Sequence, residues 1–356
     1  MEIKKTLLPE DKLKALPEDP MKLKFGTTFT DYMFTMEYYS DKGWVNPEIK
    51  PYQPLMMDPA ASVLHYGQEV FEGQKAYKNA DGEILLFRPE ENARRMNRSL
   101  KRMCMAEIPE DIYLQAEYEL LKLEERWVPS ARGAALYMRP AVIATEPVLG
   151  VRPSDHYLFF IILSPVGPYF AEGFNPVGLW VSDGYSRAAL GGTGEAKAGG
   201  NYGGSLLASR MAKEKGYSQV LWLDAKDHRY IEEVGAMNIF FVIDGKLVTP
   251  KLSGSILRGI TRNSVLQLGP EMGIEVEERA LTIDEIVEGI EAGKVTEAFG
   301  AGTAAVISPV GKLNYMGKEY VISDKSGDIS TKLFDKLTGV QYGIEADPFD
   351  WVKKVN

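Results

Sequence analysis

The stretch GGTGEAKAGGNYGG, from Gly191 to Gly204, places one lysine, Lys197, among glycines and alanines. Glycine suits positions where the backbone approaches another group closely or adopts a positive φ, and small neighbours clear space around a side chain. We therefore expect a bulky group close to Lys197. A lysine in such a cleared site can form a Schiff base when burial lowers its pKa.

Three other readings of this stretch compete with that one. A flexible turn beside a surface lysine is the simplest, and the stretch alone does not exclude it. A Walker-type phosphate loop needs Gly-Lys-Ser or Gly-Lys-Thr, but Lys197 lies between Ala196 and Ala198, so the hydroxyl that would hold magnesium is missing. The dinucleotide-binding spacing Gly-x-Gly-x-x-Gly after a strand is not met either.

Length and composition indicate a globular protein of two domains. A chain of 356 residues exceeds the usual size of a single core. The 50 acidic and 41 basic side chains give a net charge of -9, which argues against a nucleic-acid partner. The longest apolar runs, such as 158–163, have strand length, and residues 1–25 contain no secretory signal, so we expect a cytoplasmic protein without a membrane partner.

Cysteine and histidine usage argues against a metal site. Cys104 is the only cysteine, which excludes an intrachain disulfide, and we expect it to be a small buried hydrophobe. The three histidines, His65, His156 and His228, lie far apart without ligand spacing. We expect no metal.

The order of apolar and turn-forming segments predicts a mixed α/β chain. In the N-terminal half, 135–144 and 156–166 read as strands, and helices are expected at 89–105 and 109–128, each opened by proline and acidic residues. In the C-terminal half the expected strands are 178–183, 219–225 and 238–250, and the expected helices are 201–216, 259–273 and 282–293.

A proline- and glycine-rich segment, 164–176, divides the two halves. The expected domains are 1–168 and 177–356, with the linker at 169–176. Ligand sites favour such junctions.

Nine segments occur together in an order that resembles the branched-chain aminotransferases. The resemblance covers the chain from about Phe25 to the C-terminus, and so many segments in order make a specific match where any single one would be weak. The segments are FGTTFTDYMF at Phe25, LHYGQEVFEGQKAY at Leu64, LLFRPEENARRM at Leu85, LYMRP at Leu136, TEPVLGV at Thr145, GEAKAGGNYGG at Gly194, YIEEVGAMNIFF at Tyr230, SGSILRGITRNSV at Ser253 and FGAGTAAVISPV at Phe299.

The resemblance implies a fold and a cofactor. The fold is the fourth pyridoxal-phosphate fold type, with a smaller N-terminal α/β domain, a larger C-terminal pseudo-barrel domain that carries Lys197, and the cofactor at their interface. Lys197 is implied to form the Schiff base with pyridoxal 5'-phosphate and to move the proton between the substrate Cα and the cofactor. The small residues around Lys197 are then read as clearance for the pyridoxal ring.

The remaining cofactor contacts are also implied by the resemblance. Glu233 matches the carboxylate that pairs with the pyridine nitrogen, whereas Glu232 fits a solvated turn acid. Tyr202 matches the phenol that hydrogen-bonds the cofactor O3′. The phosphate is expected at Arg88, Ile260, Thr261 and Thr303, because a forked guanidinium and the first N–H groups of a helix both suit an anion.

The same family admits apolar side chains and the glutamate carboxylate in one pocket. The implied walls are Phe25, Tyr66, Phe71 and Tyr137, and Arg139 is the implied partner of the glutamate side chain. Val151 is implied to reach in from the second subunit of a homodimer, and backbone amides near Ala236 and Ala304 are expected to meet the substrate α-carboxylate.

Two positions depart from the family pattern. Ala236 stands where many relatives have threonine, so a hydroxyl is missing near the cofactor. Ala305 and Ser308 stand where some mammalian relatives carry a Cys-x-x-Cys pair, so we expect no thiol switch.

The leading hypothesis is therefore reversible ping-pong transamination between leucine, isoleucine or valine and 2-oxoglutarate. D-amino-acid aminotransferases and aminodeoxychorismate lyases share the fold and the lysine, and a non-catalytic binding protein is the remote alternative. The sequence does not decide among the three branched-chain substrates, the direction of flux, or assembly beyond a dimer.

Overall fold

The computed structural model describes residues 1–169 and 173–355. It contains two compact units: one comprises Met1–Ala171, Ala196–Gly199 and Gly339–Asn356, and the other comprises Glu172–Glu195 and Gly200–Thr338. We call them the first and second unit. Residues 170–172 of the predicted linker lie outside the described residues.

Two segments belong to a different unit from the one expected. Lys197 and the C-terminus were both expected in the second domain, but residues 196–199 and 339–356 belong to the first unit. The backbone explains the difference. Lys197 hydrogen-bonds through its N–H and C=O to Ser99 and Phe71 of the first unit. The last strand, β18 (Val352–Lys354), pairs antiparallel with β6 (Ile84–Phe87). Both segments thus return to the first unit after the chain has left it.

The first unit is built on a nine-stranded sheet of order β1-β3-β2-β8-β7-β5-β6-β18, with β4 paired to β7. All its pairings are antiparallel except that of β1 with β3. Its other strands are β1 (Lys4–Lys5), β2 (Tyr32–Tyr39), β3 (Gly43–Pro51), β4 (Glu69–Phe71), β5 (Gln74–Lys78), β7 (Ala135–Ala144) and β8 (His156–Val166).

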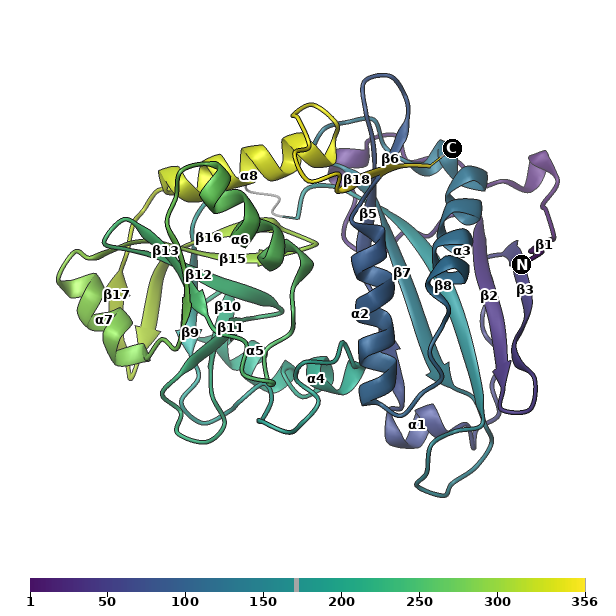
Figure 1. Cartoon of the computed structure of the whole chain (residues 1–356), viewed down its shortest axis with the longest axis horizontal. Coiled ribbons are helices and arrows are strands. Elements are labelled where there is room, and N and C mark those ends of the chain that lie inside the picture. Colours follow the sequence, from purple (N-terminus) through teal and green to yellow (C-terminus); the bar gives the residue numbers. More distant parts are fainter. Residues whose placement is uncertain (170–172, 356) are drawn as a thin grey trace. The chain divides into compact units, whose positions relative to one another are not determined.

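Helices α2 (Pro89–Arg102) and α3 (Glu110–Leu123) lie side by side over one face of this sheet (Figure 1). Their buried residues form one core with the strand residues that alternate toward them, among them Phe34, Phe159 and Leu163. The short helices of this unit are α1 (Ser62–Tyr66) and the 3₁₀ turns Glu10–Lys12, Pro20–Lys22 and Glu125–Trp127.

Two expectations for the first unit need correction. The helix expected to reach residue 128 ends at Leu123, because the next residue, Glu124, turns inward and accepts a hydrogen bond from the backbone N–H of Tyr32. Cys104 is exposed rather than buried, since it lies just beyond the end of α2 with a φ of 53°.

The second unit is a closed ring of strands. The pairing order is β11-β10-β9-β16-β15-β12, and β12 pairs again with β11, which closes the ring; β13, β14 and β17 extend it. This closed ring is consistent with the pseudo-barrel expected for the C-terminal domain, but the second unit, with 163 residues, is smaller than the first, with 193, whereas the C-terminal domain was expected to be the larger one. Its strands are β9 (Val177–Val181), β10 (Gln219–Leu223), β11 (Ile231–Val234), β12 (Met237–Ile243), β13 (Lys246–Pro250), β14 (Val276–Arg279), β15 (Val295–Gly302), β16 (Val306–Tyr315) and β17 (Lys318–Val321).

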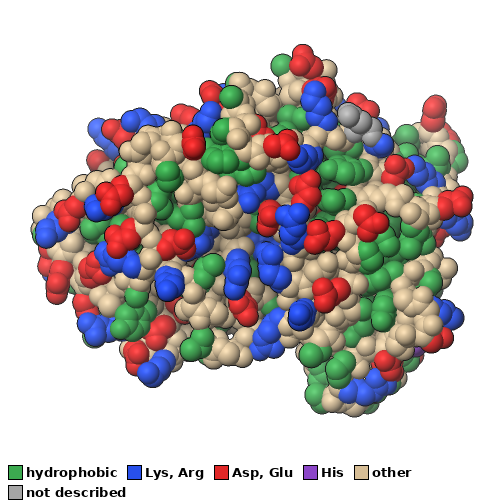
Figure 2. Space-filling view, viewed as in Figure 1, with side chains coloured by type: hydrophobic (Ala, Val, Ile, Leu, Met, Phe, Trp, Pro, Cys, Tyr) green, Lys and Arg blue, Asp and Glu red, His purple; other side chains and the backbone are tan. Residues whose placement is uncertain are grey.

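Alternating side chains on these strands pack on opposite faces. Leu179 and Leu221 belong to the cluster that includes α7 (Ile283–Glu291), whereas Trp180 and Trp222 pack against α5 (Leu206–Glu214). The remaining helices are α4 (Gly199–Gly203), α6 (Ile260–Glu271) and α8 (Asp328–Gln341). On the face shown in Figure 2, acidic and basic side chains are interspersed over much of the surface.

Candidate active site

Packing of the chain requires one glycine of the stretch around Lys197. A Cβ on Gly194 would lie 2.1 Å from the backbone carbonyl oxygen of Ser255, which leaves no room for a side chain. A Cβ on Gly199 would meet the end of the Glu69 side chain, which would have to move away. Part of the clearance that the sequence suggested for a ligand therefore serves packing of the chain against itself.

Lys197 is fixed from both sides of its backbone. Its N–H donates to Ser99 Oγ at 2.9 Å, and its carbonyl accepts from the N–H of Phe71 at 3.0 Å. The Lys197 Nζ lies 4.7 Å from the centroid of the Phe71 ring. Ser99 is buried on α2 and Phe71 ends β4, so two elements of the first unit hold this lysine in place.

A fully buried carboxylate, Glu72, adjoins this anchor. It accepts hydrogen bonds from Arg95 Nε at 2.7 Å and Nη2 at 2.8 Å and from Asn92 Nδ2 at 2.7 Å. Burial alone would raise the pKa of Glu72, but Arg95, the charge of Lys197 and the Asn92 amide outweigh it and hold the pKa below its usual value. Glu72 is therefore held as an anion, paired with Arg95 in the core of the first unit.

The aromatic walls expected for the substrate gather around one cation. The Arg139 guanidinium carbon lies 4.6 Å from the Phe71 ring and 5.3 Å from the Tyr137 ring, and Nη2 donates to Tyr137 Oη at 2.9 Å. Phe25 packs edge-on against Tyr137, with centroids 4.7 Å apart. A Cβ on Gly73 would lie 2.0 Å from Tyr137 Oη, so glycine is needed there.

Arg139 keeps an unused donor. Its Nε is buried, and among the described residues it has no hydrogen-bond partner. A buried donor without a partner costs about 1–3 kcal/mol, which an incoming acceptor can recover. The nearby Glu69 carboxyl has its pKa raised by burial, with the charge of Arg139 opposing that rise. The Arg139 guanidinium can therefore bind a carboxylate in addition to the nearby Glu69.

Tyr66 contacts the loop that carries Val151. Tyr66 lies at the end of α1 and donates a hydrogen bond from its hydroxyl to the carbonyl of Leu149. Val151, two residues further, is 84% exposed. Arg152 ties the base of the loop to Glu146 and Asp155. An apolar side chain is therefore displayed on a braced loop.

Arg88 joins β6 to α2 in an unusual backbone conformation. Its φ of 54° and ψ of 46° are left-handed, and Pro89 begins the helix directly after it. Arg88 is 8% exposed, and burial lowers the pKa of its guanidinium while the charge of Glu91 opposes that fall. The guanidinium therefore stays charged in a largely dry setting, where hydrogen bonds to an anion are strong.

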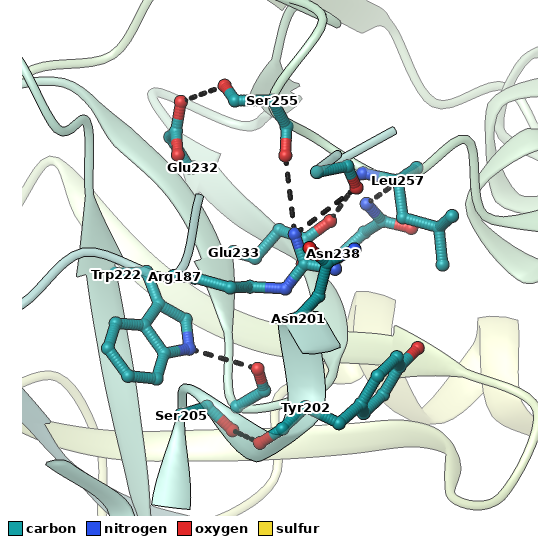
Figure 3. Close-up of polar contacts among 12 residues, drawn as sticks. Arg187, Asn201, Tyr202, Ser205, Trp222, Glu232, Glu233, Asn238, Ser255 and Leu257 are labelled. Atoms are coloured by element: carbon teal, nitrogen blue, oxygen red, sulfur yellow. Dashed lines mark hydrogen bonds and ion pairs between the residues drawn. The ribbon is translucent and has the colours of Figure 1, made fainter. Parts of the chain in front are cut away.

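In the second unit, Glu233 on β11 is held as a buried ion pair (Figure 3). Arg187 Nε lies 2.8 Å from Glu233 Oε2, and the N–H of Leu257 donates to Oε1 at 2.7 Å. Arg187 also donates to the carbonyls of Ser255 at 3.2 Å and Gly194 at 3.4 Å. A cation and a backbone donor both favour the ionised carboxylate.

The expectation for Glu232 is wrong. It was read as a solvated turn acid, but it lies in strand β11, is 7% exposed and accepts a hydrogen bond from Ser255 Oγ. Burial raises the pKa of Glu232, with the Ser255 hydroxyl opposing that rise. The two neighbouring carboxylates thus point to opposite faces of one strand and have different environments (Figure 3).

Tyr202 lies in α4, which forms part of the glycine-rich stretch 191–204. Asn201 exchanges two hydrogen bonds with Thr193, at 2.7 and 2.8 Å, and the Tyr202 carbonyl accepts from Ser205 Oγ at 2.7 Å. The Tyr202 ring extends away from Ser205 (Figure 3). The backbone is thereby fixed while the phenol projects from it.

Ile260 and Thr261 open α6, as predicted. The N-cap is Gly259, and no side chain of residues 1–169 or 173–355 caps it. A Cβ on Gly259 would lie 2.0 Å from Asn238 Oδ1, and Asn238 Nδ2 donates to the Leu257 carbonyl at 2.9 Å. The helix start therefore presents backbone N–H groups that suit an anion.

Two turns lie at one end of the barrel. Ala236 lies in the β11–β12 turn, after Gly235 with a φ of 54°, and Thr303 and Ala304 lie in the β15–β16 turn. Asn238 pairs in register with Ala301, so both turns fall at the same end of these strands. Backbone amides of such turns can receive a carboxylate or phosphate.

Several residues that contact the predicted site were not identified from the sequence. Ser99, Glu72, Arg95 and Arg187 lie far along the chain from the residues they hold, so no local spacing points to them. Glu72 lies within a segment quoted for the resemblance, which was its only signal. Among residues 1–169 and 173–355, no three His, Cys, Asp or Glu side chains lie together in a group that could hold a metal ion. Within those ranges no helix has the length and apolarity to cross a membrane.

The residues present fit pyridoxal phosphate in charge and donor type. An anchored lysine, an ionised buried carboxylate, a desolvated arginine and an uncapped helix start correspond to the aldehyde, pyridine nitrogen and phosphate of that molecule.

Comparison with known proteins gives one consistent result. Residues 69–313 match the family "Amino-transferase class IV". The chain is 53% identical over 338 residues to "Branched-chain-amino-acid aminotransferase 2" of Bacillus subtilis strain 168, covering 95% of this chain and 93% of that protein.

Solved structures agree with the sequence comparison. The branched-chain amino acid aminotransferase of Escherichia coli superposes with a TM-score of 0.75 at 28% identity, covering 92% of this chain and 99% of that one. The enzyme of Thermobaculum terrenum in its PLP-bound holo form gives 0.73 at 27% identity, covering 92% and 98%.

Proposed function

The chain belongs to the class IV aminotransferases, and we propose that it transfers the amino group between L-leucine, L-isoleucine or L-valine and 2-oxoglutarate. The reaction is reversible and ping-pong, giving the branched-chain 2-oxo acid and L-glutamate. Relatives of the same named activity, 50–53% identical over more than nine-tenths of this chain, support it. The structural observation that carries it is Arg139, a cation among aromatic rings, one of which also contacts Lys197.

The enzyme depends on pyridoxal phosphate, as its family does. Bound pyridoxal phosphate supplies the carbonyl carbon that takes up the amino group and a ring that stabilises the electron pair released at the substrate Cα. Lys197 Nζ would hold the cofactor and would move the proton at the substrate Cα. The role needs an amine that can give up its proton, which a lysine can do and an arginine cannot.

The anchored state of Lys197 supports this role. Ser99 and Phe71 fix its backbone, so only the side chain has to move between anchoring and proton transfer.

Glu233 holds the pyridine nitrogen in its protonated form, which requires the carboxylate to be ionised. The ion pair with Arg187 and the N–H of Leu257 favour that state. The Tyr202 hydroxyl would donate a hydrogen bond to the cofactor O3′.

The phosphate is held by Arg88, by the N–H groups of Ile260 and Thr261 at the start of α6, and by Thr303. The argument is electrostatic: a desolvated guanidinium and a helix start without a capping side chain both favour a dianion.

The substrate side chain lies against Phe25, Tyr66, Phe71 and Tyr137, and the substrate α-carboxylate meets amides near Ala236 and Ala304. When glutamate or 2-oxoglutarate is bound, Arg139 receives the second carboxylate. Its buried Nε, without a partner among the described residues, supports this use because an acceptor placed there removes an existing cost. Leucine leaves that donor unused, so one pocket serves both substrates.

We also propose a homodimer in which Val151 reaches the site of the neighbouring subunit. Val151 is 84% exposed and Leu149, on the same loop, is 62% exposed, so two apolar side chains of a loop held by Arg152 are available to contact another subunit.

We further propose that the protein is located in the cytoplasm. Its single cysteine cannot form an intrachain disulfide, which fits a reducing compartment.

A steady-state panel of amino donors against 2-oxoglutarate tests the function. Conversion of L-leucine, L-isoleucine and L-valine is expected, with no conversion of D-alanine. Conversion of D-alanine but not L-leucine would instead make the chain a D-amino-acid aminotransferase. A purified protein that retains no cofactor absorbance after incubation with pyridoxal phosphate and removal of the excess would contradict an aminotransferase and favour a non-catalytic protein.

The two half-reactions test Arg139 separately. Arg139→Met should slow the half-reaction with glutamate by roughly 30-fold or more, the equivalent of a lost charged hydrogen bond of about 2 kcal/mol, and leave the half-reaction with leucine nearly unchanged. Arg94→Met, which changes an exposed arginine paired with Glu91, serves as the matched control. Equal losses with both substrates would refute the assigned role of Arg139.

A further inference from the structure

The C-terminal segment covers the guanidinium of Arg88. The Arg88 Cζ lies 4.9 Å from the centroid of the Trp351 ring, within the range of a cation–π interaction. Trp351 is 6% exposed and Arg88 is 8% exposed, so the contact is desolvated on both sides. The interaction is strongest for tryptophan and increases when water is excluded.

The same residue holds the backbone of Arg88. The Arg88 N–H donates to the Trp351 carbonyl at 2.7 Å, which extends the pairing of Phe87 with Val352 by one residue. Arg88 has a left-handed backbone, a conformation that costs a residue with a Cβ about 1 kcal/mol and persists where neighbours enforce it. Trp351 therefore constrains both ends of this arginine.

Trp351 is itself rigidly supported. Its ring stacks on Phe349, with centroids 4.5 Å apart and planes inclined by 22°, and meets Phe87 edge-on at 5.5 Å. Asp347 accepts hydrogen bonds from the N–H groups of Val352 at 2.8 Å and Phe349 at 3.2 Å, which fixes the turn before the tryptophan. These contacts hold the ring and the backbone of Trp351 in one position.

We propose that Trp351 is a positioning residue that aims Arg88 at the phosphate of the cofactor, so that cofactor affinity depends on the C-terminal segment. This inference rests on the proposed role of Arg88 in phosphate binding. A guanidinium tethered only through its own flexible side chain would have to be ordered when the phosphate binds. Trp351 orders it beforehand, which removes that entropic cost from binding.

The discriminating measurement compares two ligands that differ only in the phosphate. Apoprotein prepared from the holoenzyme is titrated with pyridoxal phosphate and with pyridoxal, and the readout is the Kd of pyridoxal divided by the Kd of pyridoxal phosphate. A residue that acts through Arg88 must change this ratio, because pyridoxal has no phosphate to lose. A residue that only stabilises the fold changes the melting temperature and leaves the ratio unaltered.

Trp351→Leu is expected to weaken pyridoxal phosphate binding by roughly 3- to 30-fold, the equivalent of a desolvated cation–π contact, while pyridoxal binding stays unchanged. Trp351→Phe, which keeps an aromatic face and is the safer variant for folding, should show a smaller loss in the same direction. Trp127→Leu is the matched control, since Trp127 is a buried tryptophan of the same unit that contacts Arg126 instead. It should leave the ratio at its wild-type value.

Arg88→Met distinguishes the phosphate-binding role of Arg88 from the positioning role of Trp351. It should lower the ratio more than Trp351→Leu does, and the double variant should be no worse than Arg88→Met alone. If Arg88→Met leaves the ratio intact, the proposed phosphate role of Arg88 fails. If Arg88→Met lowers the ratio while both Trp351 variants match wild type, the positioning role alone is overturned.

Discussion

Removing Arg187 should show how strongly the buried ion pair between Arg187 and Glu233 is coupled. Arg187 Nε lies 2.8 Å from Glu233 Oε2, and the two side chains are only 5% and 3% exposed. Removing one partner of a buried pair leaves an uncompensated charge, which typically costs about 3–5 kcal/mol. Arg187→Met should therefore lower the apparent melting temperature of the apoprotein by roughly 4–7 °C, because the unfolding entropy of a chain of this length is about 0.75 kcal/mol/K.

The double-mutant cycle turns this expectation into a coupling energy. Glu233→Gln alone should also be destabilising, because it leaves the arginine buried without its counter-charge. The double variant removes both charges and should cost no more than either single change. The cycle should then give a coupling of roughly 3 kcal/mol or more, from thermal unfolding of the four apoproteins at one pH.

An exposed pair in the same unit provides the control. Arg210 and Glu214 lie 3.6 Å apart one helical turn from each other, with side chains 71% and 66% exposed. The same cycle on this pair should give about 0.3–0.5 kcal/mol. If the Arg187–Glu233 coupling falls in that range, the pair is not the desolvated anchor described here, and the argument for an ionised Glu233 loses its basis.

Two further predictions concern the first unit. Ser99→Ala leaves the buried N–H of Lys197 without its acceptor, so it should cost about 1–3 kcal/mol of stability and lower kcat more than it raises KM; an unchanged kcat would show that the anchor is unnecessary. Burial raises the pKa of Glu117 to about 8, above its unfolded value, so its contribution to stability is full below pH 4.5 and is lost as pH rises through 8. Glu117→Gln should flatten that part of the melting temperature profile, whereas Glu119→Gln, on the exposed side of α3, should not; identical profiles for wild type and Glu117→Gln would contradict it.

Much of the secondary structure could be predicted because the signals were local. The strands 135–144 and 156–166 were recovered with their bounds, since each is a continuous apolar run between turn residues. The helix at Pro89 was marked by its proline and acidic first turn. By contrast, the expected helix 201–216 is interrupted at Gly203, where α4 ends and α5 begins three residues later.

Where the prediction failed, a distant residue decided the structure. Glu124 turns away from the helix axis to meet Tyr32, which lies 92 positions earlier in the chain. Glu232 is buried because Ser255 is folded over it. No local pattern encodes such pairs.

The site residues divide in the same way. Lys197, Arg88 and Glu233 lie in short segments that a family resemblance can identify. The residues that hold them, namely Ser99, Trp351 and Arg187, lie 98, 263 and 46 positions away and become visible only when the chain is folded. The unit to which Lys197 belongs was misassigned for that reason: its position in the sequence suggested the second domain, and its hydrogen bonds tie it to the first unit.

The most direct test of the account is to identify the lysine that carries the cofactor. Borohydride reduction of the holoenzyme followed by peptide mass spectrometry should place the phosphopyridoxyl group on Lys197. The strongest competitor is Lys75 on β5, because burial lowers its pKa to about 8 and so favours the neutral, nucleophilic amine. Label on Lys197 alone would support the site as described, and label on Lys75 would contradict it.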